Sequence, residues 1–247
     1  MCVHERPADR IVSGRIRERG CWECSLRDLI LQTLSVHANA TFVDIGANIG
    51  AHTIAMAASG AAQHVYAFEA APQNLLLLDE SVRLNSLESR ITIYAAALGA
   101  QTGFVRLGHT LHANQGGLHH TERPGGVQIP RVALDSALWP IARPTFVKVD
   151  IEGSECAALR GARTFLRDSN IVGVSIEIAQ SRACCAEWCG REGLFGHLGR
   201  RGLCPFATTE RPPRLDRLDA ARCADWCASA RAPAVHDVAF VGCDAAA

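Results

Sequence analysis

A glycine-containing turn between a short strand and a helix is the feature that most constrains the fold of this chain. The segment FVDIGANIGAHT, residues 42–53, passes from β-forming residues through glycines at 46 and 50 into a helical pattern. Glycines at such a turn let the backbone pass close to a ligand, and the N-terminus of the following helix offers unpaired N–H groups. Glu69 ends a second apolar run, VYAFE, where an acid can accept hydrogen bonds from ribose hydroxyls. Turn, helix and acid in this order predict a nucleotide-binding βαβ unit.

Two polar side chains indicate which nucleotide this turn would hold. A pyrophosphate-binding turn has the pattern Gly-x-Gly-x-x-Gly, but here Asn48 stands at the middle glycine. Asp44, just before the turn, would repel a diphosphate and could instead face the positive end of a sulfonium ligand. The pattern therefore favours S-adenosylmethionine over NAD. The chain also lacks a Tyr-x-x-x-Lys pair, which disfavours an NAD-dependent oxidoreductase. The alternative is that Asp44 and Asn48 only cap the turn.

Strand and helix patterns alternate through most of the chain. The predicted strands cover residues 40–45, 64–68, 91–98, 145–153, 171–179 and 235–241. The predicted helices cover residues 26–37, 50–59, 72–84, 154–168 and 187–201. This order predicts an α/β fold with a parallel sheet covered by helices on both faces.

The segments outside this alternation suggest how the chain is organised. Residues 1–25 are polar and irregular, and the proline-rich residues 210–214 predict a loop. Glycine-punctuated alternation at 99–132 predicts a β-hairpin excursion. We therefore expect a helical or irregular extension at 1–39 and one domain at 40–247. A Cys/Arg-rich peripheral segment, residues 182–233, falls within that domain.

Composition argues against several classes of protein. The 247 residues carry 25 basic and 25 acidic side chains, so net charge gives no reason to expect broad nucleic-acid binding. No stretch approaches the ~18 apolar residues of a membrane helix, and MCVHERPADR at the start lacks the hydrophobic core of a signal peptide. We expect a cytoplasmic protein that does not span a membrane.

The chain contains 11 cysteines, an odd number. Because no signal peptide is evident, we expect free, buried thiols. The alternative is a structural zinc site that uses Cys21 and Cys24 together with Cys184, Cys185 or Cys189. The Cys-x-x-Cys spacing suits zinc, but no second pair follows at zinc-ribbon distance.

Lys148 is the single lysine among the 25 basic residues, which suggests a chemical reason for keeping it. It opens the motif Lys148-Val-Asp150-Ile-Glu152 at the end of the fourth strand of the alternating pattern, where an open α/β sheet places its ligands. Glu177, near the end of the neighbouring strand, could complete a polar cluster. We hypothesise that Asp150 or Glu152 orients an acceptor or takes its proton, with Lys148 tuning the charge. The alternative is a buried Lys148–Glu177 ion pair that joins two strands.

The hairpin region carries further candidates. His119 and His120 could bind a divalent metal together with Asp150, although a solvated loop pair is the simpler interpretation. Asn114, in the run NQGG, is expected to shape a loop over the acceptor, and the alternative is an ordinary turn. Further histidines fall near the predicted site or this hairpin: His52, His109 and His112.

Taken together, these motifs resemble the FkbM-type S-adenosylmethionine-dependent methyltransferases. The similar segments are FVDIGANIGAHTIAMA (42–57), VYAFEAAPQNLLLL (65–78), AAALG (95–99), NQGG (114–117), VKVDIEGSECAALRGA (147–162), VSIEIA (174–179) and HDVAFV (236–241). The resemblance implies a Rossmann-like class I methyltransferase fold with a mostly parallel seven-stranded sheet. It also implies methyl transfer to oxygen, often on a sugar or a secondary metabolite.

The resemblance assigns expected roles to individual residues. Glu69 would hold the ribose of S-adenosylmethionine and Ala96 would lie near the adenine. The residues expected around the methionine part and the rest of the cofactor are Asp44, Gly46, Ala47, Asn48, Gly50, Thr53, Ala70 and Asp150. The acceptor would be a small molecule or a glycan.

Two other functions remain open from the sequence. One is a non-catalytic methyltransferase fold that serves as an interaction module through its Cys/Arg-rich segment. The other is ribose 2′-O-methylation of RNA, because Lys148, Asp150 and Glu177 partly match a Lys-Asp-Lys-Glu tetrad whose second lysine is absent here.

Overall fold

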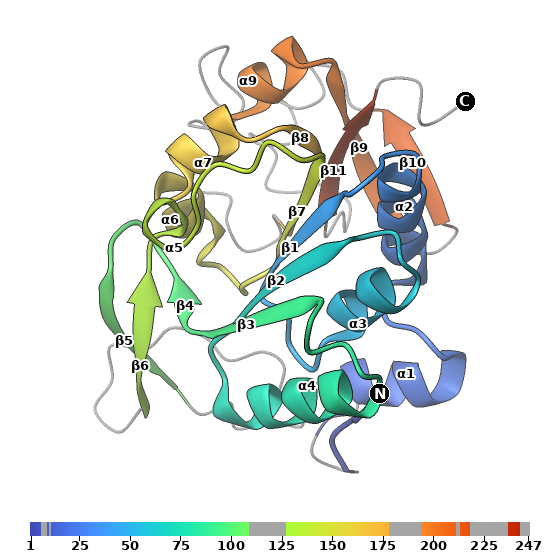
Figure 1. Cartoon of the computed structure of the whole chain (residues 1–247), viewed down its shortest axis with the longest axis vertical. Coiled ribbons are helices and arrows are strands. Elements are labelled where there is room, and N and C mark those ends of the chain that lie inside the picture. The colour runs from blue at the N-terminus through green and yellow to red at the C-terminus, as the bar shows by residue number, and fades with distance from the viewer. Residues whose placement is uncertain are drawn as a thin grey trace, which may run out of the picture.

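The computed structural model describes residues 1–5, 9, 11–108, 127–177, 194–210, 213–217 and 237–242. Its centre is one twisted sheet with helices on both faces (Figure 1). The fold is therefore α/β and Rossmann-like, as predicted.

The central sheet has eight strands in the described part of the chain, where seven were expected. In chain order they are β1 (Thr41–Ile45), β2 (His64–Glu69), β3 (Ile91–Ala95), β7 (Thr145–Val149), β8 (Ile171–Glu177), β9 (Leu203–Glu210), β10 (Pro213–Arg217) and β11 (Asp237–Gly242). Their order across the sheet is β10-β9-β11-β8-β7-β1-β2-β3. Strands β3, β2, β1, β7 and β8 run parallel, whereas β11, β9 and β10 are joined by antiparallel pairing.

The extra strand arises where a proline-rich loop was predicted. Pro213 begins β10, which pairs only with β9 at the edge of the sheet. Proline is tolerated on an edge strand because its missing N–H need not join the hydrogen-bond ladder. The loop prediction for 210–214 was therefore wrong at residues 210, 213 and 214, whereas residues 211 and 212 lie outside the described residues.

Two groups of helices cover the two faces of the sheet. The first face carries α2 (Cys24–Ser35), α3 (Ala51–Ala58) and α4 (Pro72–Leu84), whose buried side chains share one hydrophobic cluster with Phe42 and Phe146. The second face carries α5 (Leu134–Ala137), α6 (Glu155–Arg160), α7 (Arg163–Asp168) and α9 (Leu194–Arg200), which share a cluster with Val43, Val147 and Phe240. Every residue of β1 and β7 is buried, because both of their faces are covered.

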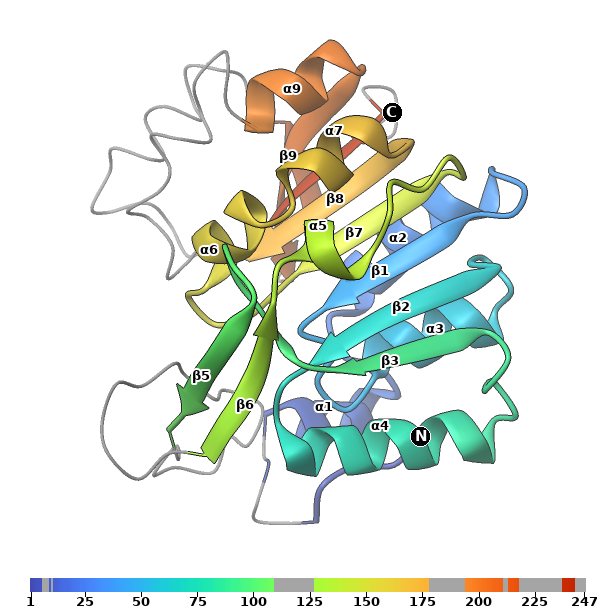
Figure 2. The ribbon, with the colours of Figure 1, turned by 60° about the vertical axis from the view of Figure 1, so that its left-hand side comes forward.

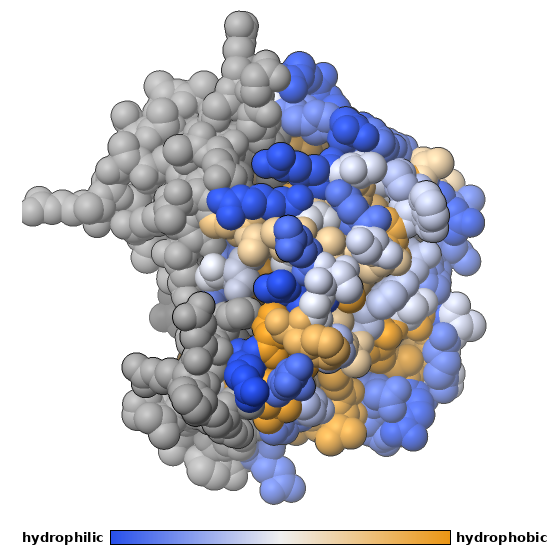
Figure 3. All heavy atoms as spheres, turned by 90° about the vertical axis from the view of Figure 1, so that its left-hand side faces the viewer, coloured by the Kyte–Doolittle hydropathy of each residue, from blue (hydrophilic) through white to orange (hydrophobic). Residues whose placement is uncertain are grey.

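Residues 97–107 and 127–132 contribute the strands of a small second sheet, whereas residues 109–126, in the middle of the predicted excursion, lie outside the described residues. Strands β4 (Ala97–Leu98), β5 (Gly103–Leu107) and β6 (Val127–Val132) are arranged in the order β4-β6-β5 beside the main sheet (Figure 2). Phe104 and Val127 remain largely exposed on it. Figure 3 shows that hydrophobic side chains gather on the lower part of the face turned to the viewer.

Two predicted boundaries were wrong for local reasons. Residues 1–25 contain a helix, α1 (Val12–Arg19), because the carboxylate of Asp9 accepts hydrogen bonds from the N–H groups of Ile11, Val12 and Ser13. The helix predicted at 154–168 is two helices, α6 and α7. Asp135 caps the second of them by accepting from the N–H groups of Thr164 and Phe165.

Cysteine pairing also differs from the prediction of free thiols. Cys21 and Cys24 form a disulfide with each other. Cys156 and Cys204 are each disulfide-bonded too. Cys21 and Cys24 are therefore not thiolate ligands in this structure, which removes the basis for the zinc alternative. Its other candidates, Cys184, Cys185 and Cys189, lie outside the described residues. Among the described helices, none is long and apolar enough to cross a membrane.

Candidate active site

The turn after β1 is built around two glycines with left-handed backbone. Gly46 has φ +84° and Gly50 has φ +88°. A Cβ added at Gly46 would lie 2.8 Å from the carbonyl carbon of Asp150 and closer still to its oxygen. Glycine is thus required at position 46 both by the backbone conformation and by the chain segment that follows β7.

The N–H groups of this turn are all satisfied within the protein. Gly46 and Ala47 both donate to the Phe68 carbonyl, and Gly50 donates to the carbonyl of Ala47. The N–H of Asn48 donates to Glu69 Oε2 at 2.7 Å, and the N–H of residue 49 donates to the Asn48 side chain. The expectation of unpaired N–H groups concerned the N-terminus of the following helix, which begins at Ala51, and it stays a prediction. A turn without free donors does not suit a pyrophosphate.

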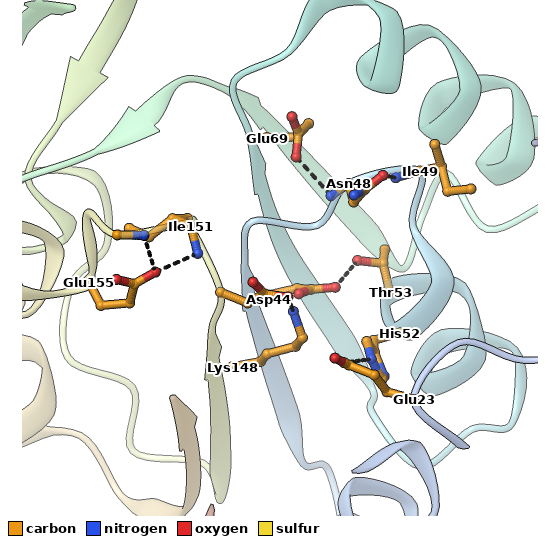
Figure 4. A network of polar contacts seen from close by, with 12 residues as sticks. Glu23, Asp44, Asn48, Ile49, His52, Thr53, Glu69, Lys148, Ile151 and Glu155 are labelled. Atoms are coloured by element: carbon orange, nitrogen blue, oxygen red, sulfur yellow. Dashed lines mark hydrogen bonds and ion pairs between the residues drawn. The ribbon is translucent and has the colours of Figure 1, made fainter. Parts of the chain in front are cut away.

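Glu69 ends β2 directly beside the turn (Figure 4). Its side chain is buried, and Oε1 accepts hydrogen bonds from the N–H of Ala71 at 2.7 Å and from Asn74 Nδ2 at 3.4 Å. Burial raises the pKa of Glu69, and hydrogen bonds from backbone N–H groups and Asn74 oppose that rise. Oε1 thus accepts two hydrogen bonds and Oε2 accepts one, so Oε2 keeps the acceptor capacity that ribose recognition requires.

Asp44, on β1, is buried behind the turn. Thr53 Oγ1 donates to its Oδ2 at 2.6 Å, while its Oδ1 has no hydrogen-bond partner among the described residues. Lys148 stands opposite Asp44 in the pairing of β1 with β7. Asp44 therefore presents one buried carboxylate oxygen with unused acceptor capacity.

Lys148 and Asp150 form the ion pair at the end of β7. Lys148 Nζ lies 2.8 Å from Asp150 Oδ2, and only 4% of the lysine side chain is exposed. Burial alone would lower the pKa of Lys148, but the carboxylates of Asp150, Asp44 and Glu23 outweigh it and raise that pKa. Burial would likewise raise the pKa of Asp150, but Lys148 holds it below its usual range. Asp150 is thus an acid at hydrogen-bond distance from the ammonium.

Three carboxylates converge beside this ion pair. Oxygen atoms of Asp150, Glu152 and Glu177 all lie within 4.8 Å of one another. Glu152 lies in the turn beyond β7, with φ 53°, and Glu177 ends the neighbouring β8. The sequence predicted this meeting of strand ends. In the described part of the chain, this trio is also the one group of three such side chains close enough to hold a metal ion.

The structure adds one pair that the sequence did not suggest. Nε2 of His52, on α3, lies 3.1 Å from Glu23 Oε2, and the histidine is almost fully buried. Glu23 comes from the N-terminal extension, has a left-handed backbone and lies between the two bonded cysteines. No spacing in the sequence connects these two residues.

The remaining predicted residues fall into two groups. Ala96 is buried directly after β3 and Ala70 follows Glu69, so both border the carboxyl ends of β2 and β3. The acceptor-side candidates Asn114, His109, His112, His119 and His120 lie outside the described residues.

Comparison with known proteins agrees with this geometry. The family model for the methyltransferase FkbM domain matches residues 44–188. None of the curated proteins matches the chain. A solved methyltransferase FkbM from Methylobacillus flagellatus KT is 27% identical, with a TM-score of 0.43 over 57% of this chain and 33% of that one. This chain thus spans about a third of that protein.

Other solved structures are more distant in sequence. SMU.1697c, a putative methyltransferase from Streptococcus mutans in complex with SAH, is 12% identical, with a TM-score of 0.47, and the match covers 87% of this chain and 94% of that one. A SAM-dependent O-methyltransferase from Thermotoga maritima is also 12% identical, with a TM-score of 0.43 over 93% and 70% of the two chains. The family match covers more than half of the sequence and contains the turn, Glu69 and the carboxylate trio. The chain therefore belongs to the FkbM family of S-adenosylmethionine-dependent methyltransferases.

Proposed function

We propose that this protein transfers a methyl group from S-adenosylmethionine to a hydroxyl oxygen of a sugar, a glycan or a small metabolite. The observation that carries the proposal is the position of the carboxylate trio. Asp150, Glu152 and Glu177 meet at the carboxyl ends of β7 and β8, one strand away from the turn after β1. In an open α/β sheet, ligands bind at this edge.

The residues around the turn fit the cofactor. The unpartnered Oδ1 of Asp44 is a buried acceptor that suits a positively charged ligand group. Glu69 would accept the ribose hydroxyls, and Ala96 would border the adenine. Gly46 and Gly50 keep the two ends of the turn free of side chains. When bound, the cofactor supplies an electrophilic methyl group.

The acceptor hydroxyl would meet the carboxylates. Asp150 is held ionised by Lys148, so it can accept a hydrogen bond from the hydroxyl and orient its oxygen toward the methyl carbon. Asp150 or Glu152 would take the hydroxyl proton as the oxygen–carbon bond forms and the carbon–sulfur bond breaks. Lys148 would stabilise the ionised form of Asp150, and Glu177 would add a third carboxylate beside the acceptor.

The first test is binding of the cofactor. Isothermal titration with S-adenosylmethionine, S-adenosylhomocysteine and NAD should show binding of the first two only, and Glu69→Ala should weaken it. Glu88→Ala is the matched control, because Glu88 is exposed and precedes β3 at the opposite edge of the sheet. Absence of binding to all three compounds would refute the enzyme and favour an interaction module with a methyltransferase fold.

The second test is methyl transfer itself. A panel of sugars, glycans and small hydroxylated metabolites, with RNA as a separate arm, is incubated with S-adenosylmethionine carrying a labelled methyl group. We expect label in a hydroxylated small molecule or glycan, and Asp150→Asn should reduce its transfer even at saturating S-adenosylmethionine. Label in RNA alone would refute the proposed acceptor class, and full turnover by a folded Asp150→Asn variant would remove this residue from the mechanism.

A further inference from the structure

We propose that His4, in the N-terminal segment, is a positioning residue for the cofactor site. It acts through Asn74, which it orients so that the amide donates to Glu69. This inference rests on the cofactor part of the proposed function, because it concerns the acid that would hold the ribose.

The three side chains form a continuous buried chain of polar contacts. His4 Nε2 lies 2.8 Å from Asn74 Oδ1, and Asn74 Nδ2 lies 3.4 Å from Glu69 Oε1. His4 is 8% exposed and Asn74 is 1% exposed. Asn74 lies in the first turn of α4, so it bridges the N-terminal segment and the end of β2.

Hydrogen-bond chemistry determines which group donates and which accepts in each of these contacts. The carboxylate of Glu69 can only accept, so the amino group of Asn74 must face it and the amide oxygen must face His4. The opposite orientation would place a carbonyl oxygen against the carboxylate. Nε2 of His4 must then carry a proton and donate it. His4 thereby selects the amide orientation that serves Glu69.

The backbone of His4 is itself fixed to α1. Its N–H donates to Ser13 Oγ at 3.1 Å, and its carbonyl accepts a hydrogen bond from the guanidinium of Arg17. The N–H of Cys2 donates to Ser81 Oγ on α4 at 2.7 Å, a second anchor of the same segment. Figures 1 and 2 both place the N-terminus against α4, close to α1. The two bonds made by the backbone of His4 itself therefore hold the residue in place, as a positioning role requires.

The consequence for Glu69 is electrostatic and geometric. Burial disfavours its ionised form, and the hydrogen bond from Asn74 opposes that effect. Together with the bond from the N–H of Ala71, it fills both lone pairs of Oε1 and so leaves Oε2 as the oxygen that can face a ribose hydroxyl. Loss of His4 would free the amide to rotate, leaving Glu69 with one donor fewer in a buried setting.

The experiment measures affinity for S-adenosylhomocysteine by isothermal titration. His4→Ala should weaken binding about five- to tenfold, the equivalent of one hydrogen bond. His4→Gln should restore most of the affinity, because its side-chain amide can donate as Nε2 does. Ser81→Ala is the matched control: it removes the other anchor on α4 without touching Asn74 or Glu69, and should stay within about twofold of wild type.

A second ligand separates positioning from general loosening. With an S-adenosylhomocysteine analogue that lacks both ribose hydroxyls, wild type and His4→Ala should bind equally weakly. The inference is overturned if His4→Ala keeps wild-type affinity, or if it weakens both ligands equally while circular dichroism shows an intact fold. It is also overturned if Ser81→Ala causes the same loss. Failure of wild type to bind either ligand would instead refute the proposed function, and this inference with it.

Discussion

The turn glycine Gly46 allows a direct test of how the site is built. Gly46→Ala should lower the free energy of unfolding by about 2–5 kcal/mol. A left-handed backbone costs an alanine about 1–2 kcal/mol. Crowding in a packed interior adds about 1–3 kcal/mol. The crowding here is severe, because the new methyl group would overlap backbone atoms of Asp150, which cannot rotate away.

Gly60 provides the matched control. Its φ is +80°, close to that of Gly46, but nothing lies within 4 Å of a Cβ added there. Gly60→Ala should therefore cost only the backbone part, about 1–2 kcal/mol. Urea denaturation of both variants at neutral pH measures the difference, and titration with S-adenosylhomocysteine should show weaker binding for Gly46→Ala only. Equal losses of stability in the two variants would refute the argument that the turn at Gly46 is packed against the backbone of Asp150.

Three further predictions concern the charged and bonded groups. Burial raises the pKa of Glu69 in the folded protein. The contribution of Glu69 to the free energy of unfolding is therefore present below the usual carboxyl pKa range and is lost as pH rises through the raised pKa. Glu69→Gln should remove this fall in stability from a series of urea denaturations at increasing pH. Lys148→Met should cost about 2–4 kcal/mol near neutral pH, since Asp150 would be left with a partly buried, unpaired charge. The loss should shrink as pH falls through the lowered pKa of Asp150, and an undiminished loss would contradict the pairing. Replacing Cys21 and Cys24 by serine should lower the free energy of unfolding, measured by thermal unfolding, by about 2 kcal/mol, because the disulfide closes a short loop in the unfolded chain. Unchanged stability would show that the disulfide does not constrain the unfolded chain.

The parts of the site on parallel strands could be predicted from the sequence. Asp44, Glu69, Asp150 and Glu177 each lie at or just beyond the carboxyl end of a strand, and a parallel sheet gathers such ends at one edge. Their approach therefore follows from the alternation of strands and helices. The ion pair of Lys148 with Asp150 follows similarly, because residues two apart at a strand end share one face.

Other contacts could not be predicted, because they join segments without regular patterns. His4 meets Asn74 across 70 residues, and Glu23 meets His52 across 29, from a stretch whose polar composition gave no sign of α1. The disulfide between Cys21 and Cys24 could not be predicted either, because Cys-x-x-Cys spacing is typical of both zinc sites and disulfides. The satisfied N–H groups of the turn depended on the Phe68 carbonyl and Glu69, which only the folded geometry brings there.

The position of β11 in the sheet has a consequence for synthesis of the protein. This strand is inserted between β8 and β9, so one edge of β8 is paired only after residues 237–242 have been made. The sequence of β8, IVGVSIE, is apolar and rich in β-branched residues, and an open edge of that kind recruits strands from other chains. A chain interrupted before residue 237 would therefore leave this edge of β8 open and be prone to aggregate.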